Sequence, residues 1–174
     1  MHQKRVHHSV CAQSQRYIIA SGTRLSNEIN TVERYDIQND SWEELPSLNI
    51  GRYRHGSCAL LSSVYVFCGM DWNANKVSSI EILNTDNLNT QEGWRLLEMP
   101  ILGERIYPGV QALNMNQIVI LGGNDAIWNS LSDCFLLNVN DETVTRVAQN
   151  NNIAISPGTL QTVKTESNVV VTIG

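Results

Sequence analysis

The chain has 174 residues, of which 42% are hydrophobic and 17% charged, an ordinary composition for one folded domain with a buried core. Its formal net charge of -5 argues against nucleic acid or an anionic membrane surface as the main partner, because both call for a basic face. The longest apolar runs are a handful of residues, whereas a membrane-spanning helix needs about 20. We therefore expect a soluble, cytoplasmic protein with no nucleic-acid and no membrane partner.

The elements predicted along the chain are short strands. The first 45 residues predict strands at 9–13, 17–21, 31–37 and 41–45, because β-forming runs there are bounded by Gly, Asn, Asp, Pro or Ser. No segment keeps the 3.6-residue apolar period of a helix over three turns. The sequence therefore predicts an all-β fold.

This strand pattern recurs at a nearly fixed interval. Four runs of β-forming residues end in glycine, at Gly22, Gly69, Gly123 and Gly174, and these glycines lie 47, 54 and 51 residues apart. A second landmark precedes each run, and it reads Arg5–Ser9, Arg52–Gly56, Arg105–Gly109 and Ala154–Gly158. A period near 50 residues indicates a repeat architecture.

A third landmark carries a family resemblance. Tyr35 and Trp42 are separated by six residues, with the turn 38–40 between them, and the third repeat has the doublet Gly122-Gly123. Glycine doublet, tyrosine, six residues and tryptophan together resemble the kelch repeat, and residues 32–46 look most like the kelch repeats found behind BTB domains. Later repeats depart from the pattern, because Leu83 replaces the tyrosine, Trp94 follows an insertion at 84–93, and the third repeat has no such tryptophan.

The resemblance implies a kelch-type β-propeller, incomplete, with about 3.5 four-stranded blades. The blades are expected at about 5–48, 49–101 and 102–150, followed by half a blade at 151–174. Exposed sheet edges tend to pair with other chains. We therefore expect the missing blades to come from the rest of a longer chain or from another copy. The residues expected to form the structural repeat motif, with the aromatic ones packed between blades, are Gly22, Tyr35, Trp42, Gly69, Trp94, Gly122, Gly123 and Gly174.

Partner-binding residues are expected in loops at one end of the blades, since strands hold such loops rigidly. Tyr, Trp and Arg are enriched at binding hot spots, and Arg24 and Arg54 suit an acidic peptide through bidentate pairing. Trp72 is notable because polar residues surround it in the sequence. Each of these side chains could equally be a solvated loop residue. The predicted set is His7, Arg24, Tyr53, Arg54, Asp71, Trp72, Tyr107, Asn124, Asp125 and Ser156.

Catalytic and metal sites are not predicted. The adjacent His7 and His8 lack nearby carboxylate or cysteine residues at ligand spacing, and no Gly-x-Ser-x-Gly nucleophile motif occurs. The four scattered cysteines are expected to be buried reduced thiols. We expect no catalytic residues, no metal and no cofactor. An alternative stays open, because a sugar mutarotase on a kelch-like propeller needs only a few polar residues in its channel.

The resulting expectation is a protein–protein interaction module that binds a partner through its propeller loops. The kelch resemblance implies two roles for such a module. One is substrate recognition for a cullin-type ubiquitin ligase, and the other is an actin-associated scaffold. Because a fold does not determine a function, both depend on the resemblance alone.

Overall fold

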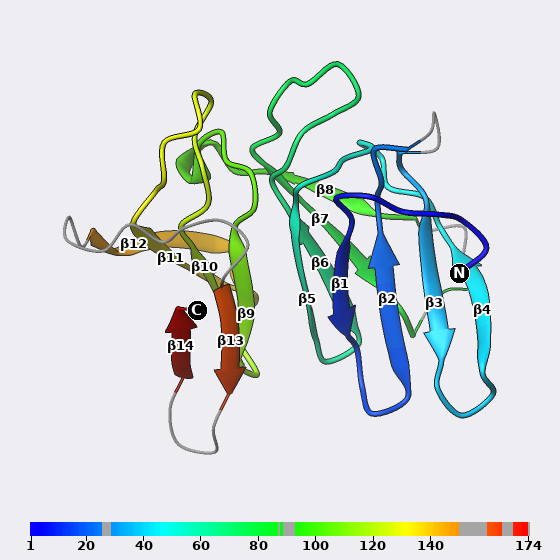
Figure 1. Ribbon diagram of the computed structural model, residues 1–174. Helices are drawn as coiled ribbons and strands as arrows, with labels where there is room; N and C mark the ends of the chain where they lie inside the picture. The colour runs from blue at the N-terminus through cyan, green and yellow to red at the C-terminus, as the bar shows by residue number, and fades with distance from the viewer. Residues whose placement is uncertain (26–28, 87, 89–92, 150–159, 165–168, 174) are drawn as a thin grey trace.

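The computed structural model describes residues 1–25, 29–86, 88, 93–149, 160–164 and 169–173. These residues form strands joined by turns and loops, with a single 3-10 turn, η1 (Pro100–Leu102). The expected all-β fold class is confirmed, since three antiparallel sheets of four strands each follow one another along the chain (Figure 1). The predicted blade boundaries stay predictions.

Each sheet is a meander in which every strand pairs with the next along the chain. Blade 1 contains β1 (Ser9–Ala12), β2 (Tyr17–Ser21), β3 (Val32–Asp36) and β4 (Ser41–Leu45). Blade 2 contains β5 (Gly56–Leu60), β6 (Ser63–Phe67), β7 (Ser79–Asn84) and β8 (Arg95–Glu98). Blade 3 contains β9 (Gly109–Asn114), β10 (Gln117–Leu121), β11 (Asp133–Asn138) and β12 (Thr143–Gln149). A two-stranded sheet follows, with β13 (Leu160–Lys164) and β14 (Val169–Ile173).

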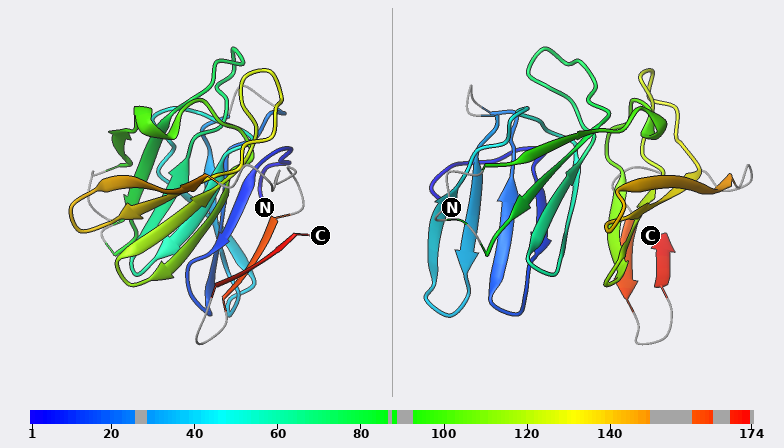
Figure 2. Two further views of the ribbon diagram at one scale, coloured as in Figure 1. Left: turned by 90° about the vertical axis from the view of Figure 1, so that its left-hand side faces the viewer. Right: turned by 180° about the vertical axis from the view of Figure 1, so that it is seen from behind.

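The first strands of successive blades are neighbours, so the sheets fan out from them. β5 lies between β1 and β9, and β13 lies on the other side of β9 (Figures 1 and 2). Ser9 Oγ and Ser57 Oγ are 2.7 Å apart across the first of these contacts. The last strand of each blade lies at the outer edge of its sheet. This radial arrangement is that of an incomplete β-propeller.

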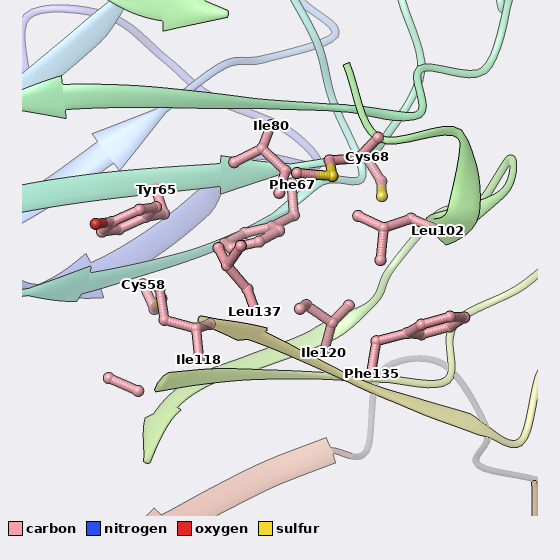
Figure 3. Packing of buried hydrophobic residues seen from close by; sticks show 12 residues of the cluster. Cys58, Tyr65, Phe67, Cys68, Ile80, Leu102, Ile118, Ile120, Phe135 and Leu137 are labelled. Carbon is pink, nitrogen blue, oxygen red and sulfur yellow. The ribbon is translucent and has the colours of Figure 1, made fainter. Parts of the chain in front are cut away.

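Two apolar cores join the three blades. The core between blades 2 and 3 brings Phe67 and Ile80 against Ile118, Ile120 and Leu137 (Figure 3). The core between blades 1 and 2 includes Ile19, Val32, Leu83 and Trp94. These strands present apolar side chains on both faces of the middle sheet, so blade 2 is the packing partner of both neighbours.

The two repeat tryptophans lie in different surroundings. Trp94 is buried between blades 1 and 2, and its indole N–H donates to the Pro46 carbonyl oxygen at 2.7 Å. Trp42 pairs with Tyr35 across β3 and β4 with ring centroids 5.0 Å apart, and both side chains are half-buried. In the part of the chain that the structure describes, no sheet covers this Tyr35 face of blade 1.

The glycine landmark aligns differently in space than in the sequence. The carbonyl oxygens of Gly22, Cys68 and Gly122 each accept a hydrogen bond from the arginine that opens their repeat. These three residues also share positive φ angles of 67°, 58° and 50°. Gly22 is therefore structurally equivalent to Cys68 and Gly122. The glycines that end the second and third runs, Gly69 and Gly123, each lie one residue after this shared position. Gly174 lies outside the described residues.

Candidate partner-binding site at the loop end of the blades

A buried arginine–carboxylate pair anchors the segment that leads into each blade. The arginine of the second landmark approaches a carboxylate on the third strand at 2.7 Å in blades 1 and 2 and at 3.0 Å in blade 3. Burying such charges is favourable only when hydrogen bonds satisfy them, and each guanidinium also donates to backbone carbonyl oxygens. The pairs are Arg5–Glu33, Arg52–Glu81 and Arg105–Asp133.

The third pair is built differently from the other two. In blade 2, Glu81 on the third strand pairs with Val66 on the second. At the equivalent position of blade 3, Phe135 pairs with Ile120, so a phenyl ring replaces the carboxylate. Asp133, two residues earlier on the same face of β11, accepts from Arg105 instead. The Arg105 guanidinium carbon also lies 4.9 Å from the centre of the Phe135 ring. The arginine therefore keeps its place by a cation–π contact and a displaced carboxylate.

Two residues after each anchoring arginine the backbone enters the left-handed region. His7, Arg54 and Tyr107 have φ angles of 57°, 57° and 53°, values that residues other than glycine seldom adopt. The Arg54 N–H donates to the His7 carbonyl oxygen at 2.8 Å, and the Tyr107 N–H donates to that of Arg54 at 2.6 Å. Equivalent turns of three blades are therefore hydrogen-bonded to one another, which brings their side chains together.

Aromatic rings surround the Arg54 side chain. Its guanidinium carbon lies 5.5 Å from the centres of the Tyr53 and Tyr107 rings and 4.7 Å from that of Trp128. Its Nε is buried without a hydrogen-bond partner among the described residues, and its Nη1 donates to the Met70 sulfur at 3.7 Å. The half-buried Arg54 thus carries a positive charge with no anion beside it in this part of the chain.

Arg24 and His7 complete this group. The Arg24 guanidinium carbon lies 5.3 Å from the centre of the Tyr53 ring, and Tyr107 Oη lies 2.9 Å from His7 Nδ1. Seven of the nine arginines in the sequence approach a carboxylate. Within the described residues, the two that do not are Arg24 and Arg54. We call this group the Arg54 cluster, and it comprises His7, Arg24, Tyr53, Arg54, Tyr107 and Trp128.

The histidines near the cluster are held in the neutral form. Burial, with the nearby charges of Arg54 and Arg24, lowers the pKa of His7. Complete burial, with smaller contributions led by Arg52, lowers the pKa of His55 to about 3. Lost hydration penalises the charged imidazolium, and the adjacent guanidinium groups repel it. The positive charge of the cluster at neutral pH therefore comes from the arginines.

Two matching loops stand at this end of the blades, at 71–75 and 125–129 (Figure 1). In the first, the Asp71 carboxylate accepts from the backbone and side-chain amides of Asn75 at 2.8 and 2.9 Å. In the second, Asp125 accepts from both amides of Asn129 at 2.9 Å. We call them the clamped loops, because each aspartate ties the two ends of its loop together.

The clamped loops expose large apolar side chains. Trp72 is 54% exposed, Trp128 is 55% exposed and Ile127 is 76% exposed. Arg54 contacts both loops or their flanks, since its guanidinium carbon lies 4.7 Å from the centre of the Trp128 ring and its Nη1 lies 3.7 Å from the sulfur of Met70, the residue before Asp71. Rigid loops that present tryptophan to solvent have the composition of a protein-binding surface.

The predicted partner-binding residues fall into two groups in space. His7, Arg24, Tyr53, Arg54 and Tyr107 come together in the Arg54 cluster. The others hold or flank the clamped loops: Asp71 and Asp125 accept hydrogen bonds within them, the buried Asn124 donates to the Trp128 carbonyl oxygen at 3.0 Å, and Trp72 lies at a loop tip. Ser156 lies outside the described residues.

Sequence reasoning missed Trp128 and Ile127. A signal for them exists, because Asp71 and Asn75 have the same spacing as Asp125 and Asn129. Aligning those two pairs would have marked the residues between them as one repeated loop. Trp128 was overlooked because it stands at a different position of that loop from Trp72.

The described residues contain no group of three or more His, Cys, Asp or Glu side chains that could hold a metal ion. They also include no helix with the length and apolar character needed to cross a bilayer.

Comparison with known proteins agrees with this geometry. Residues 4–49 match the Kelch motif family model. The chain is 30% identical over 106 residues to Kelch-like protein 26 of Danio rerio and 38% identical over 104 residues to Kelch-like protein 28 of Homo sapiens. These matches cover 58% and 56% of this chain and 17% of each relative.

A third relative comes from a plant. An F-box/kelch-repeat protein of Arabidopsis thaliana is 27% identical over 99 residues, which cover 57% of this chain and 24% of that protein. The chain thus spans no more than about a quarter of the relatives it matches. The repeated blades, their anchoring arginines and these matches together show that the chain contains kelch-type repeats and forms an incomplete kelch-type β-propeller.

Proposed function

We propose that this protein is an interaction module whose Arg54 cluster binds an acidic segment of a protein partner. The observation that carries the proposal is the Arg54 guanidinium, which has three aromatic rings around it and no carboxylate among the described residues. Arg24 adds a second guanidinium beside Tyr53, and it too has no carboxylate partner among the described residues.

The energetics of an unpaired arginine support an anionic ligand. Aromatic rings stabilise a guanidinium modestly, whereas a carboxylate forms two parallel charge-assisted hydrogen bonds with it. The left-handed turns at His7, Arg54 and Tyr107 are linked by backbone hydrogen bonds, which hold the site in place before binding. This preorganisation reduces the entropy lost when a ligand binds. The exposed Trp72 and Trp128 would extend the contact with the partner beyond the charged pair.

A pair of peptide pools tests this proposal. One pool of labelled nine-residue peptides has Glu at the centre, the other has Gln, and all remaining positions are randomised. We expect the Glu pool to bind the chain about tenfold tighter in fluorescence anisotropy titrations, because charged hydrogen bonds contribute about 1.5–3 kcal/mol. Arg54→Met should remove that preference.

Arg16→Gln is the matched control, since Arg16 lies in the turn at the opposite end of blade 1 and pairs with Asp36. It should keep the preference for Glu. Equal binding of the two pools to the unchanged chain would contradict the proposal. A double Arg54→Ala, Trp72→Ala variant that keeps full affinity for an identified partner would contradict the role of these two residues.

We further propose, on the kelch resemblance, that the partner is either a substrate delivered to a cullin-type ubiquitin ligase or a component of actin structures. The names Kelch-like and F-box/kelch-repeat among the relatives support a shared module and leave this choice open. The uninterrupted coding sequence around these residues, followed by copurification with cullin or with filamentous actin, distinguishes the two roles. A BTB and BACK region in that sequence would favour the ligase role.

A further inference from the structure

A cleft lies beside the 125–129 loop, and Asp125, Ala126 and Ile127 form part of its lining. It has a volume of about 620 Å³ and an open mouth, and its apolar wall includes Ile101, Leu102, Ile127, Leu131 and Phe135. Ile127 and the neighbouring Trp128 connect it to the Arg54 cluster, since Trp128 contacts the Arg54 guanidinium while Ile127 lines the cleft. We call it the Ile127 cleft.

The cleft results from the change of repeat pattern in blade 3. At the junction of blades 1 and 2, the Glu81 carboxylate accepts hydrogen bonds from the backbone amides of Asn49 and Ile50, which draws that connecting segment onto β7. At the junction of blades 2 and 3, Phe135 occupies the equivalent position and offers no acceptor. The connecting segment there forms η1 instead, and Phe135 is part of the wall of the cleft.

Charges around the cleft select against a second acidic group in it. Three carboxylates line it, those of Glu104, Asp125 and Asp133, together with two guanidinium groups, so the lining has a net charge of −1. Both guanidinium groups, of Arg105 and Arg146, lie against Asp133, at 3.0 and 3.6 Å. A carboxylate entering the cleft would add to this excess of negative charge. An uncharged apolar side chain would instead cover the exposed Ile101 and Ile127, which are 52% and 76% accessible.

We propose that the acidic segment carries an apolar side chain close to its acidic residue, and that this side chain occupies the Ile127 cleft while the carboxylate pairs with Arg54. This inference rests on the proposed function and specifies the chemistry of the partner. Trp128 lies 4.7 Å from Arg54, and adjacent Cα atoms are about 3.8 Å apart. Because Trp128 contacts Arg54 and its neighbour Ile127 lines the cleft, we place the apolar residue within about three positions of the acidic one, which is about 10 Å of extended chain at about 3.3 Å per residue.

The peptide pool with central Glu tests this inference. Members retained by the immobilised chain are sequenced position by position. We expect Leu, Ile, Phe or Trp to be enriched about tenfold over Ser at one or more positions within three of the Glu, because burying such a side chain strengthens binding by roughly this factor or more. Ile127→Ser should abolish the enrichment and leave the requirement for Glu in place.

Met115→Ser is the matched control. Met115 is 66% exposed in the turn between β9 and β10, at the opposite end of the same blade, so the substitution removes a similar apolar surface elsewhere. It should leave both preferences unchanged. Because Ile127 is an exposed loop residue, its replacement is not expected to unfold blade 3, and an unchanged thermal transition verifies this.

The outcomes separate the two proposals. A Glu preference without apolar enrichment, or an enrichment that survives Ile127→Ser, overturns the occupied cleft and leaves the proposed function standing. Loss of the Glu preference in the unchanged chain overturns both. Apolar enrichment that depends on Ile127 and a Glu preference that depends on Arg54 together support the inference.

Discussion

Single charged residues decide both the stability of the blades and the chemistry of the site. Arg52 and Glu81 are fully buried and bonded to each other, so the anchoring arginine is a structural residue. Arg54, two positions later, has no such partner among the described residues and is available to a ligand. Within the landmark Arg52–Gly56, one arginine is therefore structural and the other is free to bind a ligand. The difference is that the third strand supplies a carboxylate to Arg52 and none to Arg54.

Breaking one anchoring pair should strongly destabilise the protein. We expect Glu81→Gln to lower the free energy of unfolding by about 3–5 kcal/mol, because it leaves the buried Arg52 without its counter-charge. Urea denaturation followed by tryptophan fluorescence measures this. Glu142→Gln removes the exposed partner of Arg95 and should cost less than about 1 kcal/mol. Equal effects of the two substitutions would show that burial does not set the strength of these pairs.

Protonation of His55 should weaken the fold at low pH. Its folded-state pKa of about 3 lies below the ordinary value of 6.5, so between these values the unfolded chain binds more protons than the folded one. Stability due to this group is therefore complete above pH 6.5 and is lost as the pH falls toward 3, by at most about 1.4 kcal/mol per pH unit. Unfolding free energies of the unchanged chain and His55→Gln, measured from pH 7 to pH 4.5, should converge as the pH falls. A constant difference between them would contradict this prediction.

At the scale of the elements, the faces of the strands decide which blades meet. Blade 2 is apolar on both faces, and Trp94 fills the junction with blade 1. Tyr35 and Trp42 occupy the equivalent face of blade 1, where the described residues provide no opposing sheet. A repeat aromatic thus becomes a packing residue only when the neighbouring blade is present.

Two tryptophan substitutions should separate these situations. In the chain of residues 1–174 we expect Trp94→Ala to cost about 3–5 kcal/mol of unfolding free energy, since it opens a cavity between two blades and removes the bond to Pro46. Trp42→Ala removes a half-buried ring and should cost clearly less. Thermal unfolding monitored by circular dichroism compares the two. A larger loss for Trp42→Ala would indicate that another sheet covers the Tyr35 face.

At the scale of the whole molecule, the three four-stranded blades form an open array, and no sheet among the described residues covers the Tyr35 face of blade 1. The uncovered face of blade 1 includes Val10, which is 52% exposed, together with the Tyr35 and Trp42 rings. In the middle blade the matching face is buried against its neighbour. Apolar sheet faces and unpaired edges favour association.

We therefore predict that residues 1–174, expressed alone, associate at micromolar concentration through the Tyr35 face. Sedimentation velocity should show species larger than one chain, and Trp42→Glu should shift the distribution toward the monomer. A stable, well-folded monomer of the unchanged residues would contradict the prediction. Glu43→Ala serves as the control. Glu43 is exposed next to Trp42 and pairs with Arg34, so its replacement changes the net charge of the protein but leaves the Tyr35 face unaltered.

The sequence by itself determined the repeat and the all-β class, because a period near 50 residues and short β-forming runs can be recognised along the chain. The glycine, tyrosine and tryptophan landmarks carried the resemblance to kelch repeats. The sequence also marked His7, Arg24, Tyr53, Arg54 and Tyr107 as candidates from their place in the repeat. The pairing of each anchoring arginine with a carboxylate 28 or 29 positions away was decided only by the tertiary structure.

The same holds for the site. Which arginines lack a carboxylate among the described residues depends on the strands that fold beside them. The Ile127 cleft lies between Phe135, which offers no acceptor, and the segment that connects blade 2 to blade 3. These are contacts between residues distant in the chain, which a repeat pattern cannot specify. The sequence determined the repeated strands, and the packing of one blade against the next decided which side chains stay exposed at the loop end of the blades.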